Sequence, residues 1–391
     1  MEDYELQEEE FWRKLEEESM SRSSMLRRSA AAAFGLTVIS SPAAAWAARK
    51  GGEEALAMDG TPLKKLVQAA KKEGHLNVIA LPHDWANYGQ MISTFKGKYG
   101  LGMTEDNPNG SSAQENQAIR SLKGDKRAPD VVDVGPSFAV AGAQEGLYRP
   151  YKVAKYKTIP ASMKDPRARW YGDYWGAISI GYNANVIKPA PKSFKDLLKP
   201  AYKNKVALNG SPLSSNSAVS IVFAAALANG GSVNNIGPGI DYFHRLKQAG
   251  NFIPVDGTPQ TVASGQTPIV LDWDYLNLAY RKEFPAVHWA ATIPSDGVYG
   301  SFYCQAINAT APHPNAAKLW MEFLYSDQGQ LIWLKGYSHP ARFRDLVKHK
   351  KVPKALLRAL PSSKLYAKVK FATPAQQEKA KAEIAARWPG I

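Results

Sequence analysis

The stretch IVLDWDY, residues 269–275, joins an apolar run to two acids that enclose a tryptophan. Carboxylates are costly to bury and aromatic rings are seldom left exposed, so this combination indicates a lined binding site. A carboxylate beside an indole face can hold an organic ammonium group, which would give Asp272, Trp273, Asp274 and Tyr275 a role in binding. The alternative is that the two acids only cap the helix expected to begin near Tyr275.

Two further loops carry polar and aromatic side chains directly after a predicted strand. The strand at 75–81 precedes a loop with an acid, an imidazole and aromatic rings, and the strand at 206–208 precedes a loop rich in hydroxyl groups. In open α/β sheets, ligands bind beyond the carboxyl ends of the strands, so we expect a small-molecule site there. The candidate contacts from these loops, and from the end of the strand at 131–135, are His83, Asp84, Trp85, Tyr88, Ser137, Ser214, Ser215 and Asn216.

The charge of the solute is left open by these residues. The aspartates with Trp85 and Trp273 favour a cation held between charge and ring. Residues 210–216, which lead into a predicted helix, offer hydroxyls and free backbone N–H groups, and these favour an anion. The same hydroxyl residues could equally be simple helix caps.

Segments typical of strands and of helices alternate along the chain. Apolar residues recur at helical spacing in 62–72, and short β-rich runs occur at 131–135, 206–208 and 269–271. This alternation predicts an α/β protein with largely parallel sheets. The 391 residues suit two lobes, and the basic tail at 364–388 is expected to be helical.

Composition excludes several classes of function. The formal net charge is +14, but the lysines are scattered and no arginine-rich run or RNA-binding motif occurs, so we expect a solvated basic surface and no nucleic-acid partner. Cys304 is the only cysteine, which excludes an internal disulfide and predicts a small buried residue. The chain lacks nucleotide-binding, HExxH, GxSxG and EF-hand motifs, so neither a cofactor, a metal site nor an enzyme is predicted.

Residues 1–47 are predicted to be an N-terminal extension and a signal peptide. Arg27 and Arg28 precede an apolar run at 30–39, and Ala45-Trp46-Ala47 fits a cleavage site near Ala47. The apolar run is too short to span a membrane. Because no cysteine follows it, we expect an exported periplasmic protein that is not a lipoprotein. Both the Sec and the twin-arginine export routes remain open.

The order of several segments resembles family 1 extracellular solute-binding proteins, the periplasmic receptors of ABC importers. The resemblance covers roughly residues 75 to 345. The segments that carry it are LNVIALPHDWANYGQMISTFKGKYG, APDVVDVGPSFAVAGAQEGLYRPY, YWGAISIGYNANVI, SFYCQAINATAPHPNAAKLWMEFLYSDQGQ and GYSHPARF. Each motif is weak alone, whereas their order and spacing together are specific.

The resemblance implies a two-lobed type II binding-protein fold, with mixed, mostly parallel sheets flanked by helices and a ligand cleft between the lobes. It assigns residues 48–174 with 302–330 to lobe 1, and 175–301 with 331–391 to lobe 2. The strands that cross between the lobes would carry Trp175 and Tyr303, and Trp175 either lines the cleft or packs the hinge. Hinge closure and delivery of the solute to inner-membrane ABC permease subunits by a monomer follow by the same likeness.

The resemblance favours a polyamine or another organic amine as solute, although the late crossing strand at 301–305 lacks the acid that polyamine receptors carry there. Ferric-iron receptors carry adjacent tyrosines where this chain has Asp274 and Tyr275, so ferric iron is an alternative. An aminophosphonate or other anion is a third. A periplasmic enzyme on the same fold, and a scaffold bound to anionic envelope polymers, are hypotheses of a different functional class.

Overall fold

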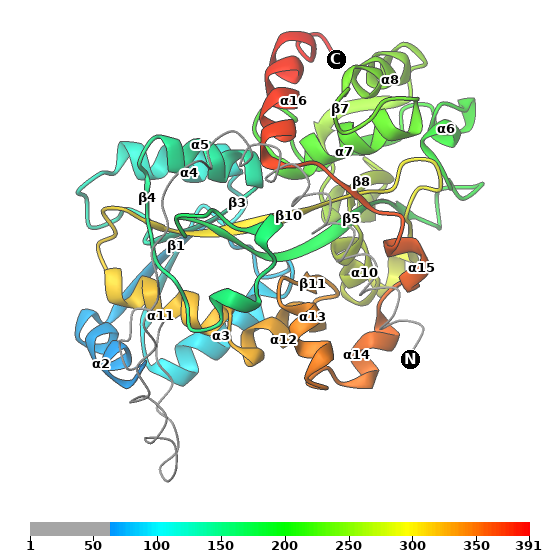
Figure 1. Cartoon of the computed structure of the whole chain (residues 1–391). Helices are drawn as coiled ribbons and strands as arrows, with labels where there is room; N and C mark the ends of the chain where they lie inside the picture. The colour runs from blue at the N-terminus through cyan, green and yellow to red at the C-terminus, as the bar shows by residue number, and fades with distance from the viewer. Residues whose placement is uncertain (1–62) are drawn as a thin grey trace, which may run out of the picture.

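The computed structural model describes residues 63–391, and the predicted signal peptide lies outside the described residues. The chain forms two α/β lobes that are linked by two long strands (Figure 1). The first lobe begins with α2 (Leu63–Glu73), β1 (His75–Ile79), α3 (Tyr88–Tyr99), β2 (Gly102–Asp106), α4 (Ser112–Ser121), β3 (Val131–Val134), α5 (Pro136–Gln144) and β4 (Tyr148–Arg149).

The linking strand β5 (Tyr171–Asn183) leads into the second lobe, and β10 (Tyr299–Asn308) leads back to the first. The elements between them are α6 (Phe194–Leu197), β6 (Val206–Leu208), α7 (Asn216–Ala228), α8 (Gly237–Gln248), β7 (Phe252–Asp256), α9 (Pro259–Ser264), β8 (Ile269–Trp273), α10 (Asp274–Glu283) and β9 (Trp289–Thr292). The chain ends with α11 (Pro314–Leu324), α12 (Asp327–Lys335), β11 (His339–Pro340), α13 (Phe343–Lys348), α14 (Lys354–Ala359), α15 (Ser363–Tyr366), β12 (Lys370–Phe371) and α16 (Pro374–Arg387).

The strands other than β5 and β10 pair in parallel, whereas the pairs made by these two linking strands are antiparallel except that of β10 with β12. β1 pairs with β2, and β6 pairs with both β7 and β8, all in parallel. β5 and β10 run antiparallel to each other, β10 also pairs antiparallel with β3 and β4, and β5 pairs antiparallel with β8 and β9. The α/β class is therefore confirmed, with a mixed sheet order β12-β10-β5-β8-β6-β7.

β5 is buried along its whole length, and its glycines make room for neighbouring side chains. A Cβ at Gly176 would lie 2.5 Å from the Tyr275 ring, and one at Gly181 would lie 1.8 Å from Asn277 Oδ1. α10 can therefore pack directly on the strand. Since α10 begins where β8 ends, this packing fixes the segment from Asp272 to Tyr275 between the strand and the cleft.

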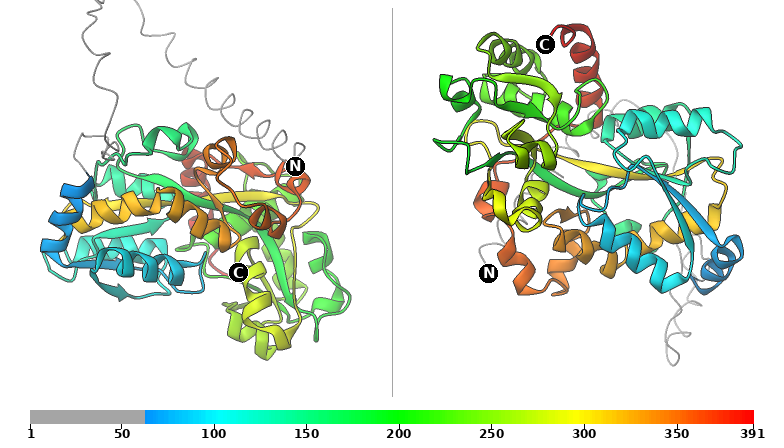
Figure 2. Two further views of the ribbon diagram at one scale, coloured as in Figure 1. Left: turned by 90° about the horizontal axis from the view of Figure 1, so that it is seen from below. Right: turned by 180° about the vertical axis from the view of Figure 1, so that it is seen from behind.

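The C-terminal elements pack on both lobes. α11 packs on α2 and α12 packs on α3, whereas α16 contacts α5 on one side and α8 on the other. Figure 1 and the right view of Figure 2 show α16 between α5 and α8. The predicted division, 48–174 with 302–330 and 175–301 with 331–391, stays a prediction, and α16 makes contacts across it.

The tail at 364–388 is not one helix. Residues 367–373 interrupt it with the short strand β12, and α16 begins only after Thr373, whose hydroxyl accepts a hydrogen bond from the Gln376 N–H. Pro374 lacks an N–H and disfavours helix at the residue before it, so the helix has to restart there. Of the residues described, no helix is long and apolar enough to cross a membrane.

Candidate functional site

A cleft of about 990 Å³ opens between the two lobes. The first lobe contributes the loop after β1, residues 108–111 and the start of α4, and the second contributes residues 209–217, the segment 256–260 and Tyr280. Tyr303 on β10 lies between the two walls. The cleft is lined by four carboxylates and one guanidinium, which belong to Asp84, Glu115, Asp133, Asp256 and Arg120.

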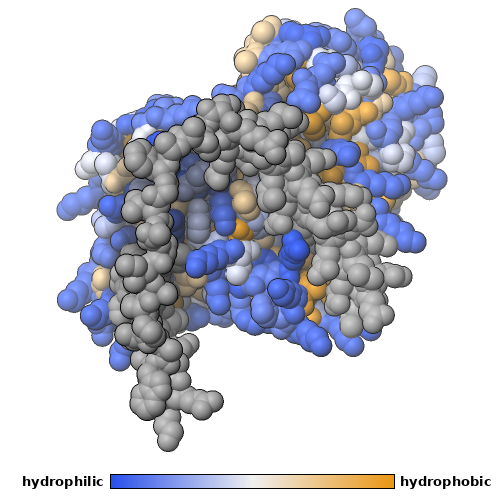
Figure 3. All heavy atoms as spheres, in the orientation of Figure 1, coloured by the Kyte–Doolittle hydropathy of each residue, from blue (hydrophilic) through white to orange (hydrophobic). Residues whose placement is uncertain are grey.

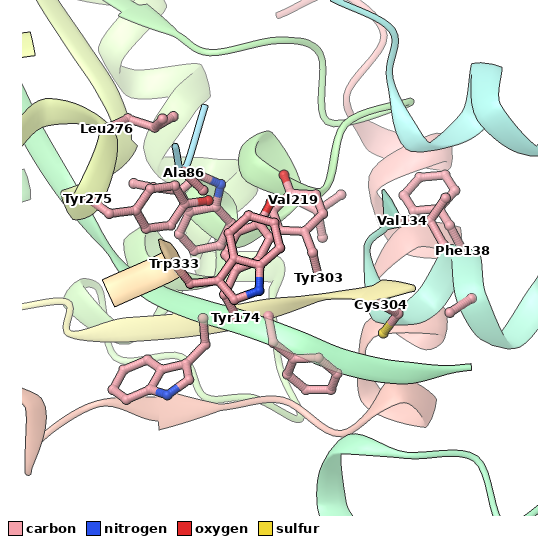
Figure 4. Close-up of a cluster of buried hydrophobic side chains, with 14 of the residues drawn as sticks. Ala86, Val134, Phe138, Tyr174, Val219, Tyr275, Leu276, Tyr303, Cys304 and Trp333 are labelled. Carbon is pink, nitrogen blue, oxygen red and sulfur yellow. The ribbon is translucent and has the colours of Figure 1, made fainter. Parts of the chain in front are cut away.

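Aromatic rings form one end of the cleft. The indole of Trp85, which is only partly buried, meets the Tyr303 ring edge-on at 5.7 Å between centroids and the Tyr275 ring at 6.2 Å. Behind them, Tyr174 stacks on Tyr303 at 5.6 Å. Figure 4 shows Tyr174, Tyr275, Tyr303 and Trp333 gathered beside the linking strands. Rings packed in this way present edges and faces to a solute at little entropic cost.

An acidic cluster lies directly behind this aromatic wall. Asp133 Oδ2 accepts hydrogen bonds from the hydroxyls of Tyr88 at 2.7 Å and Tyr174 at 3.0 Å, while its Oδ1 has no partner among the described residues. Glu115 Oε2 accepts from the backbone N–H of Asp133 at 2.7 Å. The carboxyl of Asp173 lies within hydrogen-bond reach of the Asp133 carboxyl and completes the cluster, and Gln305 donates to Asp173 at 3.1 Å.

This cluster has no basic partner within the described part of the chain. Glu115, Asp133 and Asp173 are at most 5% exposed, and no described lysine, arginine or histidine forms an ion pair with them. Burial raises the pKa of all three carboxyls, and their mutual repulsion adds to the shift of Glu115 and Asp173. Arg120, the guanidinium in the lining, is already bound to both carboxylate oxygens of Glu145. A cationic group in the cleft would supply the missing positive charge.

Asp84 and Asp272 form a second acidic pair near the cleft. The negative charge of Asp84 contributes to the raised pKa of Asp272, which burial brings to about 7. Asp272 also accepts a hydrogen bond from Asn209 Nδ2 at 2.6 Å. Asn209 and Asp84 line the cleft, whereas Asp272 does not. Asp272 would therefore act on a solute indirectly, through its hydrogen bond with Asn209.

The loop that carries Asp84 and Trp85 has an unusual backbone. Ala80, Ala86 and Asn87 all have positive φ angles, of 57°, 44° and 68°. Residues with a Cβ rarely adopt this conformation, and they concentrate where the surrounding structure fixes a functional loop. The indole N–H of Trp85 donates to Tyr174 at 2.8 Å and so ties the loop to β5.

The opposite wall is rich in hydroxyl groups. Ser215 and Ser217 share a hydrogen bond at 2.7 Å, and Ser217 also donates to the backbone oxygen of Asn209 at 3.0 Å. No side chain caps the first turn of α7, where Asn216 lies. The N–H groups of that turn therefore have no side-chain cap, and its residues Asn216 and Ser217 line the cleft.

The structure places six of the predicted residues in the lining and three more directly behind it. The lining residues are Asp84, Trp85, Ser214, Ser215, Asn216 and Tyr303. Tyr88, Trp273 and Tyr275 are fully buried but pack in the same aromatic and acidic network. Whether any of them contacts solute stays a prediction.

The other five predicted residues also lie outside the lining, and four of them have polar or ring partners. His83 is exposed and bonds Glu105 at 2.6 Å, Ser137 is buried in α5, and the Trp175 ring stacks on His339 at 4.3 Å. Asp274 accepts hydrogen bonds from the hydroxyl of Tyr366 at 2.5 Å and the N–H of Ala177 at 3.0 Å. Asp272, held by Asn209, is the fifth. The two aspartates do not share a strand face, because β8 ends at Trp273 and Asp274 begins a helix.

Sequence reasoning missed the most buried acids of the cleft. Asp133 interrupts the apolar run Val131-Val132-Asp133-Val134. An acid within a strand expected to be buried indicates a functional residue and could have been recognised from the sequence. Glu115 lies on the buried face of the otherwise polar helix α4, and nothing in its local sequence marks it. Within residues 63–391, no group of three or more His, Cys, Asp or Glu residues is arranged to hold a metal ion. Cys304 is free and buried, as expected.

Residues 126–368 match the model of the family described as bacterial extracellular solute-binding protein. The chain belongs to this family. It is therefore a solute-binding receptor of an ABC transporter, as the resemblance in the sequence indicated, and the family implies a periplasmic location.

Solved structures of other binding proteins share the two-lobed fold. Iron-bound HitA from Pseudomonas aeruginosa is 18% identical with a TM-score of 0.62, and the match covers 81% of this chain and 99% of that one. AfuA from Actinobacillus pleuropneumoniae, with fructose-6-phosphate bound, is 18% identical with a TM-score of 0.60 over 80% and 98%. A putative spermidine/putrescine ABC transporter protein from Listeria monocytogenes is 14% identical with a TM-score of 0.59 over 80% and 99%. The type II fold is thus confirmed, while these proteins differ in what they hold.

Proposed function

We propose that this receptor captures an organic amine with two or more amino groups, a diamine or polyamine, and delivers it to an ABC permease. The observation that carries the proposal is the pair Glu115 and Asp133, two carboxylates beside an aromatic wall with no described basic partner. Buried carboxylates without a cation are costly, so a solute that brings ammonium groups would be stabilised by pairing with them.

The aromatic wall supports an organic amine over a bare cation. An ammonium group held against a desolvated ring gains about 2 kcal/mol from the quadrupole of that ring. Trp85 is placed for this contact because it is the partly exposed ring of the cluster. The methylene groups of the amine would contact Tyr303 and Tyr280, which also line the cleft.

Two separate acidic positions support a solute with two charged ends. Trp85 is linked through Tyr174 to Asp133 on one side, whereas its neighbour Asp84 lies close enough to Asp272 to influence its pKa. One amino group would lie near Asp133 and the other near Asp84. A monoamine would satisfy only one of these positions.

A second candidate is a zwitterion such as an aminophosphonate. It is favoured by the uncapped first turn of α7 and the serines beside it, because backbone N–H groups at a helix start attract anions. Its ammonium end would lie at Asp133 as in the first proposal, and its anionic end near Ser215. Ferric iron as the solute and a periplasmic enzyme on this fold have no comparable observation in their favour among the described residues.

Capture by closure of the two lobes fits the arrangement of the linking strands. β5 and β10 are the structural connection along which the lobes would rotate, and both cleft walls lie beside them. We propose that the protein works as a monomer and that the permease recognises the closed form.

Calorimetric titration of the refolded, ligand-stripped protein would test the proposal. The panel would contain 1,4-diaminobutane, spermidine, butylamine, 2-aminoethylphosphonate, fructose-6-phosphate and ferric citrate. We expect the diamine or spermidine to bind most tightly, and butylamine to bind much more weakly. Tight binding of 2-aminoethylphosphonate alone would favour the second candidate, and binding of ferric citrate alone would overturn both.

Two variants show whether the binding uses the acidic cluster. Asp133→Asn and Glu115→Gln should each weaken diamine binding by about 30-fold or more, because removing one partner of a buried charge pair costs at least about 2 kcal/mol. Asp125→Asn is the matched control, since Asp125 pairs with Arg127 on the surface outside the cleft. Equal affinity in all three variants would remove the acidic cluster from the site.

A further inference from the structure

The segment from residue 344 to residue 370, which we call the basic segment, concentrates positive charge on one part of the molecule. It contains nine lysines and arginines and a single acid, Asp345. All nine cations are exposed, whereas Asp345 is partly buried and is bound by Arg342, which is 1% exposed. The nine are Arg344, Lys348, Lys350, Lys351, Lys354, Arg358, Lys364, Lys368 and Lys370.

Few of these cations are neutralised by the rest of the described chain. Lys351 pairs with Asp327. No described carboxylate lies within ion-pair distance of the following seven: Lys348, Lys350, Lys354, Arg358, Lys364, Lys368 and Lys370. The charge of the segment is therefore directed to solvent and can act on a partner within about 10 Å, the screening length at moderate salt.

The charges lie on a compact part of the structure. The short helices α13, α14 and α15 carry them, and these helices lie side by side in Figures 1 and 2. A small apolar cluster of Leu334, Phe343 and Leu360, with Leu356 and Leu357 packed against it, holds the segment on α12. Leu365, 37% exposed, stands among the lysines. Where Figure 3 shows coloured atoms, most of them are hydrophilic and the hydrophobic residues form small areas.

We propose that the basic segment binds the anionic phospholipid surface of the membrane in which the permease lies. Lysine outnumbers arginine seven to two in the segment. Protein–protein interfaces are depleted of lysine and enriched in arginine, so a protein partner is less well matched. Flexible lysines spread over three short helices suit a fluid surface of headgroups that has no fixed geometry, with the exposed leucine as a minor apolar contact.

Such attraction would serve a receptor that must meet a membrane protein. A protein held loosely at the membrane surface searches for its partner in two dimensions, and weak, reversible attraction allows it to leave after delivery. The inference uses charge and exposure alone and is independent of which solute the cleft takes.

Vesicle sedimentation with the protein purified from the periplasmic fraction would test this inference. Vesicles of phosphatidylcholine would be compared with vesicles that contain one-third phosphatidylglycerol. We expect binding only to the anionic vesicles, and loss of that binding in high salt. Absence of binding to anionic vesicles at low salt would overturn the proposal.

A pair of matched variants separates the segment from the net charge of the protein. Replacing Lys348, Lys354, Arg358 and Lys368 by Gln should weaken vesicle binding by about tenfold or more. The control replaces four exposed lysines of α2, Lys64, Lys65, Lys71 and Lys72, by Gln, which removes the same charge from a helix far from α14 in Figure 1.

We expect the control to bind vesicles within about twofold of the unchanged protein. Equal losses in both variants would show that net charge alone acts and would overturn the proposal, as would binding that the basic-segment variant retains in full. Circular dichroism would confirm that both variants fold, and because all eight positions are exposed, we expect them to.

Discussion

Two buried aspartates near the cleft, Asp274 and Asp133, differ in their hydrogen-bond partners and therefore in the role that we expect for each. Asp274 is 2% exposed, and its oxygens accept from the Tyr366 hydroxyl and from backbone N–H groups, so the fold itself satisfies it. Asp133 is similarly buried, but its carboxyl lies against a second acid, Asp173, and no described basic group pairs with either of them. The fold itself satisfies the first acid, whereas the second is the one that we propose for a cationic solute.

Binding of an amine should depend on pH because of this cluster. Burial raises the pKa values of Glu115, Asp133 and Asp173, so a fraction of these carboxyls holds a proton at mildly acidic pH. An ammonium group favours the ionised carboxylate, and a proton must leave before the amine binds. Diamine affinity should therefore fall as the pH is lowered from about 8 to about 5.

Calorimetry in two buffers of different ionisation enthalpy would count the protons released on binding. We expect release at pH 6 in the unchanged protein and a smaller release in Asp133→Asn. An affinity that is constant over this pH range, or proton uptake on binding, would contradict the role of the cluster.

At the scale of elements, the starts of α5 and α7 meet across the cleft. Gly135 precedes α5, and a Cβ there would lie 2.4 Å from the Asn216 side chain on α7. The φ angle of Gly135 is −61°, so the glycine is required by the close contact and not by the backbone. The two helix starts belong to opposite walls, and this contact limits how closely they approach.

Gly135→Ala should weaken solute binding because the added methyl group pushes the two walls apart. We expect a loss in affinity of about tenfold, which corresponds to about 1.4 kcal/mol, measured by calorimetry with the best ligand of the panel. Gly97→Ala is the control, because no atom lies within 4 Å of its Cβ position on the exposed side of α3. That variant should bind normally and be stabilised by about 0.5–1 kcal/mol.

The sequence allowed the elements to be predicted better than the site. Periodicity and turn residues located α2, β1, β6 and β8 within two residues of their observed ends, because these features are local. The break at Pro374 inside the tail was also local but was overlooked. Asp274 and Trp175 were candidate contacts because of their chemistry. In the structure Tyr366 donates a hydrogen bond to Asp274 and the His339 ring stacks on Trp175, and both partners lie more than 90 residues away in the chain. Such tertiary partners have no signal in a single sequence.

At the scale of the whole molecule, three connections hold the lobes together. β5 and β10 cross between them, and α16 packs on α5 and α8 through a buried face that includes Ile384. Lys381 of α16 lies 4.0 Å above the Phe138 ring, and Arg387 pairs with Asp241 of α8 at 2.5 Å. In the closing motion proposed above, these contacts would permit rotation of the lobes and oppose their separation.

Closure should therefore be visible as a change in overall size. Small-angle X-ray scattering of the stripped protein, before and after saturation with its ligand, should show a smaller radius of gyration in the bound form. The Gly135→Ala variant should show a smaller decrease at saturation. An unchanged radius in the wild-type protein, with calorimetry confirming saturation, would show that the cleft binds without closing.

The position of Trp85 makes the intrinsic fluorescence of the protein suitable for following solute binding. Of the tryptophans in residues 63–391, Trp85 is the only one that is not buried, and the others are 8% exposed or less. The fluorescence of buried indoles changes little with the solvent, whereas we expect the emission of Trp85 to shift in wavelength when a solute displaces water from the cleft. Occupancy can therefore be followed in real time without an attached dye, and a stopped-flow trace would give the rates of capture and release directly.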